Sequence, residues 1–258
     1  MMDTHETMHL AAEAGKIILE NGGETYRVEE TITHICQCYG IEEVDSFVTP
    51  TGIMMSVTDT EGNSFSLVKR VTKRVVNLEK VRLVNDISRR VQHEKPPVRS
   101  VREELKHIKT IGSYSHLTTV AISSTAAGFF CLLYGGSFRD FCVAFFIGCL
   151  LNLLTWISDK LQLIGFLTNL TGGAVATFTA LFMTHMGIGV NEDKITIGAI
   201  MLLVPGLAIT NAIRDTIAGD LVSGLSRGLE AFFVAVAISV GAGFAYEFWY
   251  VIIGTVQN

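Results

Sequence analysis

Charged residues are distributed so unevenly along this chain that they divide it into two parts. Residues 1–110 hold 15 Lys and Arg and 17 Asp and Glu, whereas residues 111–258 hold only 5 and 8. A water-exposed domain needs charged side chains over its surface, so the second part is too apolar to be one. The distribution predicts an α-helical integral membrane protein, with a small polar domain at residues 1–110 and a transmembrane domain at residues 111–258.

Apolar stretches in the second part are long enough to cross a bilayer as helices. About 20 helical residues cross the hydrocarbon core. Short connections separate the stretches, so each can be a span of its own. We expect about five transmembrane helices, near residues 117–134, 141–157, 163–186, 195–213 and 229–253.

The basic residues beside these stretches predict which side of the membrane each connection faces. Cytoplasmic connections are enriched in Lys and Arg. One side of the predicted membrane domain has Arg139 and Lys194, and the other has Lys106, Lys109, Lys160, Arg214 and Arg227. The chain starts without a basic segment followed by an apolar one, so we expect no removable signal peptide. These features predict a cytoplasmic N-terminus and a C-terminus outside.

The residue pattern of the polar domain predicts an α+β fold. Apolar residues recur at helical spacing in residues 10–18, 28–39, 78–91 and 101–108. They alternate with polar residues in 44–49, 53–57 and 65–67, with turn residues between these runs. The alternation predicts three short antiparallel strands. Pro96-Pro97 interrupts the helical pattern, and the spacing of Ser100 and Glu103 predicts a capping box at the start of the last helix.

Motifs and composition argue against nucleic-acid binding, metal binding and catalysis. Basic residues are interleaved with acidic ones and form no face of one sign. Cys36-x-Cys38 lacks the second ligand pair that zinc needs. Asp215 and Asp220 are five positions apart on a predicted helix and do not face each other, as an intramembrane catalytic pair would. We expect no catalytic residue, metal, cofactor or nucleic-acid partner.

Small and polar residues make the third predicted span unlike a simple anchor. Asn169, Thr171 and Gly172 fall within it, followed by Ala and Thr at close intervals. Such residues let helices approach closely and hydrogen-bond across an interface. Tight helix packing and a share in a solute path both fit this pattern.

The fourth predicted span is interrupted by Pro205-Gly206 near its middle. Proline removes a backbone hydrogen bond, and discontinuous helices mark the binding sites of many secondary transporters. The interruption therefore predicts either a structural kink or part of a binding site.

Charged residues gather directly after this interruption, at one edge of the predicted membrane domain. Asn211 and Asp215 would share one helix face, and an arginine such as Arg214 can bind a carboxylate through two parallel hydrogen bonds. A partly buried acid could carry a proton. An ordinary cytoplasmic loop with solvated charges is the alternative. The candidate polar residues of this segment are Asn211, Arg214, Asp215, Asp220, Arg227 and Glu230.

Three runs in the sequence resemble the threonine/serine exporter (ThrE-like) family. They are NGGETYRVEETI at 21–32, FVTPTGIMMSV at 47–57 and, most specifically, VPGLAITNAIRDTIAGDLVSGLSRGLEA at 204–231. The resemblance covers nearly the whole chain in order. It implies a plasma membrane protein of a bacterium that exports small hydroxy amino acids, driven by the proton gradient, with Pro205, Gly206 and the six residues from Asn211 to Glu230 in the transport region.

The chain differs from the one-chain members, which continue into a second membrane half. The likeness is therefore to the split form, in which a smaller all-helical membrane subunit completes the transporter; a homo-oligomer is a further possibility. Split members are associated with dicarboxylates such as succinate, so the substrate stays open between threonine or serine and dicarboxylates. The alternative function is a membrane-anchored regulatory or scaffold subunit that senses a cytoplasmic ligand.

Overall fold

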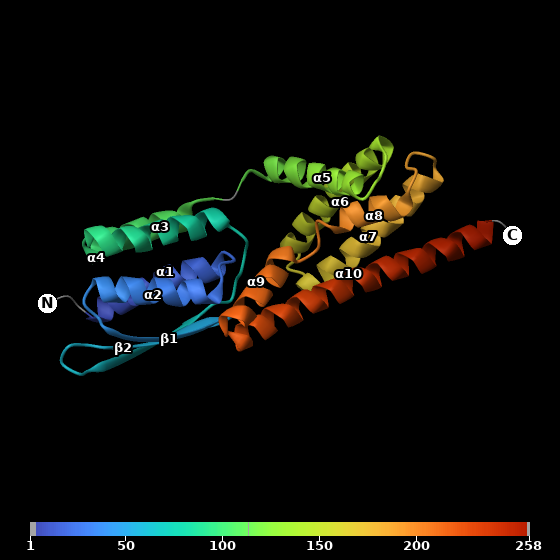
Figure 1. Cartoon of the computed structure of the whole chain (residues 1–258). Helices are drawn as coiled ribbons and strands as arrows, with labels where there is room; N and C mark the ends of the chain where they lie inside the picture. Colours follow the sequence, from blue (N-terminus) through green and yellow to red (C-terminus); the bar gives the residue numbers. More distant parts are fainter. Residues whose placement is uncertain (1–3, 113, 257–258) are drawn as a thin grey trace. The chain divides into compact units, whose positions relative to one another are not determined.

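The chain forms two compact units that do not coincide with the two halves of the sequence. The computed structural model describes residues 4–112 and 114–256. Unit 1 comprises residues 1–113 and 206–229, and unit 2 comprises residues 114–205 and 230–258 (Figure 1). The chain therefore passes between the units at three places, one of which is the Pro205-Gly206 pair. We expected residues 111–258 to form one domain. Residues 206–229 instead group with the N-terminal residues in unit 1.

Four helices and a sheet form the N-terminal part of unit 1. The helices α1 and α2 lie between the sheet and the pair α3 and α4 (Figure 1). The strand order is β1-β2-β3, with both pairs antiparallel, as the alternating pattern predicted. The elements are α1 (Thr4–Glu20), α2 (Thr25–Cys38), β1 (Glu43–Thr49), β2 (Gly52–Thr58), β3 (Ser64–Arg70), α3 (Leu78–Glu94) and α4 (Val98–Thr110).

The core of unit 1 follows from the apolar spacing. Ile53 and Val57 of β2 are buried against the helices, whereas the alternate residue Met54 is exposed. The break between α3 and α4 falls at the two prolines as predicted, but α4 begins at Val98, directly after its N-cap residue Pro97. Ser100 is therefore already inside the helix, and the capping box predicted there is wrong. The fixed φ of proline suits the start of a helix, and no side chain caps this one.

Unit 2 is built from apolar helices. The short helix α8 packs against α5, α6 and α7, and buried residues of these helices form one apolar core. Four helices of the described chain are long and apolar enough to cross a membrane, with candidate spans at His116–Leu133, Phe138–Lys160, Gly165–His185 and Leu221–Ile252. The helices are α5 (His116–Leu133), α6 (Phe138–Lys160), α7 (Gly165–His185), α8 (Glu192–Ile200) and α10 (Leu221–Val256), the last of which begins in unit 1.

The structure differs from the expected helix over residues 195–213. It contains two helices there, α8, which ends at Ile200, and α9 (Gly206–Ala218). Pro205 lacks an N–H and disfavours helical backbone at the residue before it, so the pattern of apolar residues continues while the helix does not. The number of helices of spanning length is consequently four where about five were expected.

Candidate functional site

The loop between α1 and α2, residues 21–24, has a backbone that only glycine fits well. Gly22 has a φ of +91°, and a Cβ on Gly23 would lie 2.3 Å from the side chain of Ile18. The chain can therefore reverse within a few residues, between Glu20 and the start of α2 at Thr25. This loop presents its carbonyl groups to another segment of unit 1.

That segment is the α9–α10 hairpin, residues 206–229, which contacts the α1–α2 loop through buried polar side chains. The Nδ2 of Asn211 donates to the carbonyl of Gly22 at 2.9 Å. The Nη2 of Arg227 donates to the carbonyl of Gly23 at 2.9 Å. Both donors are buried. Two residues 16 positions apart in the hairpin thus satisfy the two successive glycine carbonyls.

Asp215 caps the N-terminus of α2. The N-cap residue Glu24 makes no side-chain cap of its own. Instead, the fully buried carboxylate of Asp215 accepts hydrogen bonds from the backbone N–H and the hydroxyl of Thr25, each at 3.1 Å. A carboxylate at a helix N-terminus is favoured by the free N–H groups and by the helix dipole. The Nε of Arg227 lies 2.9 Å from Oδ2 of Asp215, so this buried charge is paired.

Glu24 lies between two arginines. Its Oε2 accepts from Nε of Arg27 at 2.9 Å, and its Oε1 accepts from Nη1 of Arg214 at 2.6 Å. The side chain of Arg214 is 56% exposed, whereas that of Glu24 is only 10% exposed. Burial alone would raise the pKa of Glu24, but hydrogen bonds from its own backbone and from the two arginines outweigh burial and lower it. Glu24 is therefore ionised at neutral pH.

Two further acids lie at the same site. Glu29 accepts the backbone N–H of Val48 in β1 at 3.0 Å, and the carbonyl of Val48 accepts from the hydroxyl of Ser223 at 3.1 Å. Burial and the neighbouring carboxylates of Asp220 and Asp215 raise the pKa of Glu29, despite the Val48 hydrogen bond. Burial and the charge of Asp215 raise the pKa of Asp220 as well. Residues from all three family-like runs thus meet at one site in unit 1.

Comparison with known proteins identifies the family to which these runs belong. The family model described as "Putative threonine/serine exporter" matches residues 9–249. The chain belongs to the threonine/serine exporter family. Members of this exporter family are transporters and not enzymes, and the chain is a multi-pass membrane protein with several apolar helices. The resemblance drawn from the three runs is confirmed.

Curated relatives in the exporter family have two kinds of name. Proteins of Klebsiella aerogenes and Escherichia coli, both named "Probable succinate transporter subunit YjjP", are each 24% identical over 244 residues, which cover 93% of this chain and 93% of each relative. The "Threonine/serine exporter" of Corynebacterium glutamicum is 22% identical over 247 residues, which cover 93% of this chain and 50% of that protein. No solved structure matches the chain.

Within this member of the exporter family, the structure brings some predicted residues together and separates others. Asn211, Asp215 and Arg227 form the buried contacts above, and Arg214 lies at their edge. Asp220 is half-buried directly before α10, where its carbonyl accepts the N–H of Gly224 at 2.9 Å. Of the remaining residues of this group, Pro205 and Glu230 belong to unit 2, and Gly206 is the exposed first residue of α9.

The predicted residues of the third span lie on α7 in unit 2, with Asn169 half-buried and Thr171 exposed. The hydroxyl of Thr171 donates to the carbonyl of Leu167 in its own helix at 2.7 Å. Gly172 is buried, and a Cβ there would lie 2.9 Å from the side chain of Leu203. Its neighbour Gly173 lies against the backbone of α10. These contacts favour tight helix packing over a solute path.

Several residues of the site were not singled out from the sequence as separate candidates. They belong to runs of the family resemblance, but no local pattern indicated what each contacts. The capping carboxylate lies 190 positions from the Thr25 that it caps, so neither residue carries a sign of the other. The residues missed in this way are Glu24, Thr25, Arg27, Glu29, Val48 and Ser223.

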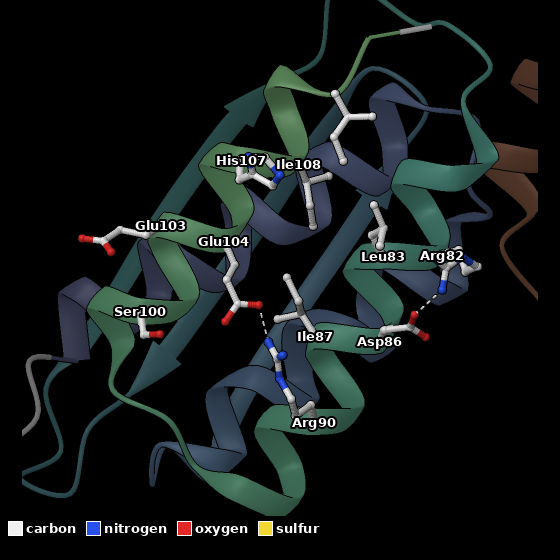
Figure 2. A pocket seen from close by; sticks show the side chains of 11 residues that line it. Arg82, Leu83, Asp86, Ile87, Arg90, Ser100, Glu103, Glu104, His107 and Ile108 are labelled. Carbon is white, nitrogen blue, oxygen red and sulfur yellow. Dashed lines mark hydrogen bonds and ion pairs between the residues drawn. The ribbon is translucent and has the colours of Figure 1, made fainter. Parts of the chain in front are cut away.

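A separate groove of about 680 Å³ lies between α3 and α4 of unit 1, and Figure 2 shows the side chains that line it. Leu83, Ile87 and Ile108 supply apolar surface. The Arg82–Asp86 ion pair lies along α3, and Arg90 is paired with Glu104 of α4. The groove contains none of the residues predicted for transport. Among the residues that the structure describes, no group of His, Cys, Asp or Glu is placed to hold a metal ion.

Proposed function

We propose that this protein is a secondary exporter subunit for small solutes that carry a carboxylate, threonine and serine or dicarboxylates such as succinate. The observation that carries the proposal is that all three family-like runs meet at one site, around the first turns of α2. Packing alone does not require the buried Asp215–Arg227 ion pair and the hydrogen bonds to two successive glycine carbonyls at one place. Ionisable residues at such sites are functional candidates.

The proposed orientation puts unit 1 in the cytoplasm of a bacterium and unit 2 in its plasma membrane. The basic residues beside the apolar stretches support it. Exposed apolar residues on the hairpin, which include Ile213, Ile217 and Leu225, support its location at the membrane surface. They line a groove of about 630 Å³ on the face opposite the polar contacts.

The proposed topology needs a crossing that no long helix supplies. If α5, α6 and α7 each cross once, residues 186–205 must cross back, because residues 206–229 pack with the N-terminal residues of unit 1. The nine residues of α8 rise about 14 Å, roughly half of a core about 30 Å thick. Residues 201–205 would complete the crossing without a regular helix. Their free backbone groups would then lie near the midplane, as they do in discontinuous helices of other transporters.

In the proposed mechanism, the exposed guanidinium of Arg214 binds the solute carboxylate, and Glu29 or Asp220 takes up and releases a proton. Raised pKa values bring these two acids closer to neutral pH than an ordinary carboxyl group. Asp215, by contrast, is held in its ion pair, and Glu230 belongs to the other unit. Of the three acids expected to carry the proton, Asp215, Asp220 and Glu230, we propose Asp220, and we add Glu29.

A second membrane chain completes the transporter in this proposal. Two relatives carry the word subunit in their names, and the chain spans only half of the C. glutamicum exporter. A smaller helical subunit or a second copy of this chain are the two forms that the partner could take.

The test is efflux of threonine, serine and succinate from loaded cells that express this chain alone or with a candidate small membrane subunit. Arg214→Ala should abolish efflux. Arg82→Ala is the matched control, because Arg82 is also an ion-paired arginine with 57% of its side chain exposed, but it lies on α3. Absence of efflux in every combination, with normal membrane insertion, would refute the proposal, and so would equal loss in both variants.

The groove between α3 and α4 favours the alternative, a regulatory subunit that senses a cytoplasmic ligand. The α1–α2 loop and the hairpin charges belong to one site, so substitutions there do not distinguish the two functions. Arg90→Ala alters the groove alone. A regulatory subunit should lose ligand-dependent control in Arg90→Ala, whereas an exporter should keep its flux.

A further inference from the structure

We propose that the Glu24 carboxylate is a tethered occupant of the carboxylate site formed by Arg27 and Arg214, and that an exported solute binds there by displacing it. This inference rests on the proposed function and adds how the solute site is kept closed when empty.

The geometry of the three side chains matches the recognition of a free carboxylate. One oxygen of Glu24 accepts from Nε of Arg27 at 2.9 Å, and the other accepts from Nη1 of Arg214 at 2.6 Å. Carboxylate recognition in proteins uses charge-assisted hydrogen bonds of this kind to arginine. A solute carboxylate in the same position would receive the same two bonds.

The exposure of the side chains shows that a solute can reach Arg214 more easily than Glu24. More than half of the Arg214 side chain is open to solvent, whereas Glu24 is nearly covered. The hydrogen bond from Arg214 to Glu24 is made by Nη1. A solute can therefore approach Arg214 from solvent first and then replace Glu24 on the inner side, without a prior opening of the loop.

Helix α2 does not require the Glu24 side chain in its observed position. The usual task of an N-cap side chain is to accept a free N–H of the helix. Here Asp215 accepts the N–H of Thr25, and the Glu24 side chain makes no cap hydrogen bond. Displacement of the Glu24 carboxylate would leave the capped helix start, the two glycine carbonyl contacts and the Asp215–Arg227 pair intact.

Charge also favours a closed empty site. Without Glu24, the arginines Arg27 and Arg214 would place two positive charges together, and a nonspecific anion could occupy them. Because the two arginines lower the pKa of Glu24, its carboxylate keeps its charge throughout the neutral range. The occupant is therefore removed by competition with another carboxylate and not by a change of pH.

The test uses the full chain with its partner subunit, in proteoliposomes, and succinate or threonine as the probe. Glu24→Gln keeps the size of the side chain and removes the charge that competes. The half-saturating concentration of the transported solute should fall about threefold to tenfold, the range expected when a charge-assisted contact no longer competes. Glu79→Gln is the matched control, because Glu79 is likewise paired with an arginine, Arg82, but lies in the first turn of α3 and is not part of the carboxylate site, so it should change nothing.

A second measurement covers the case in which Glu24→Gln is poorly folded. A bound solute raises thermal stability in proportion to the logarithm of its concentration over its Kd. Succinate should therefore raise the Tm of Glu24→Asp more than that of the wild type, because the shorter side chain reaches the arginines less well. An unchanged or weaker response in both Glu24 variants would overturn the inference.

Failure of the inference and failure of the proposed function give different results. If wild-type flux is lost in Arg214→Ala but both Glu24 variants bind solute as the wild type does, only the tethered carboxylate is refuted. If the wild type shows neither flux nor a Tm response to any of these solutes, the proposed function is refuted with it.

Discussion

Asp215→Asn is the substitution that most directly tests the contact between the α9–α10 hairpin and the α1–α2 loop. An amide keeps the size of the carboxylate but replaces one acceptor oxygen with a donor. In the wild type, both oxygens face donors, the N–H and hydroxyl of Thr25 and the guanidinium of Arg227. At least one of these donors would then face an NH₂ group, and the buried Arg227 would lose the Asp215 carboxylate.

The expected cost follows from burial. Removal of one partner from a buried ion pair costs about 3–5 kcal/mol. The side chains of Arg227 and Asp215 are 7% and 0% exposed, so solvent can compensate for little of the loss. If the hairpin separates from the loop as a unit, about 3 kcal/mol corresponds to a roughly 100-fold larger open fraction.

Amide hydrogen exchange, followed by mass spectrometry on the purified full chain, measures this open fraction. Peptides that cover residues 22–28 and 206–229 should exchange roughly 100-fold faster in Asp215→Asn. The matched control is Asp86→Asn, since Asp86 also pairs with an arginine but is 56% exposed, and an exposed pair is worth less than about 1 kcal/mol.

The double variant Asp215→Asn, Arg227→Met separates pairing from other effects. Removing both charges should cost less than the sum of the two single changes, because no unpaired charge stays buried. Exchange within threefold of the wild type in Asp215→Asn, or additive effects in the double variant, would show that the pair does not hold the hairpin to the loop.

Three further predictions concern other contacts. Because the folded-state pKa of Glu29 is raised, stability should fall as pH rises from the ordinary carboxyl pKa through the raised one, and Glu29→Gln should flatten this slope in Tm measured from about pH 4 to pH 8; an unchanged slope contradicts the burial argument. Gly173→Val should lower the Tm in detergent by the equivalent of at least about 1–3 kcal/mol, because a Cβ there would lie 2.4 Å from a backbone oxygen of α10, whereas Gly243→Ala, with open space around it, should not. In Asp140→Ala, the backbone N–H groups of residues 190 and 191 lose their acceptor, and the free energy of unfolding should fall by about 1–3 kcal/mol for each. A lower Tm would show this loss, whereas Asp159→Ala, at an exposed position of α6, should leave the Tm unchanged.

Local spacing was sufficient to predict the helices and strands of the N-terminal part of unit 1. The alternation of buried Ile53 and Val57 with exposed Met54 is a property of one strand, so the sequence of that strand determines it. Asn211 and Asp215 were expected on one helix face, and the structure places both in contact with the α1–α2 loop. Periodicity fixes these relations because the residues involved are near neighbours along the chain.

Contacts between distant segments and the break at Pro205 could not be predicted from local spacing. Hydropathy treated residues 195–213 as one span, since apolar composition does not reveal whether the backbone stays helical past Pro205. No residue near Thr25 in the sequence indicates that its N–H is capped by the hairpin. The sequence also suggests that the Arg214 guanidinium is available to a solute, whereas in the structure it donates to Glu24. Such contacts depend on where a distant segment folds, and a single sequence carries no local trace of it.

The discontinuous make-up of unit 1 has a consequence for biosynthesis. Residues 1–113 leave the ribosome about 90 residues before residue 206 is made, so the α1–α2 loop must wait for its hairpin. At 5–20 residues per second the delay is about 5 to 20 s. During that time the carbonyls of Gly22 and Gly23 and the N–H of Thr25 have only water as partners. Synthesis of helices α5 to α8 thus precedes closure of the site, and a nascent chain stalled before residue 206 would carry an open loop.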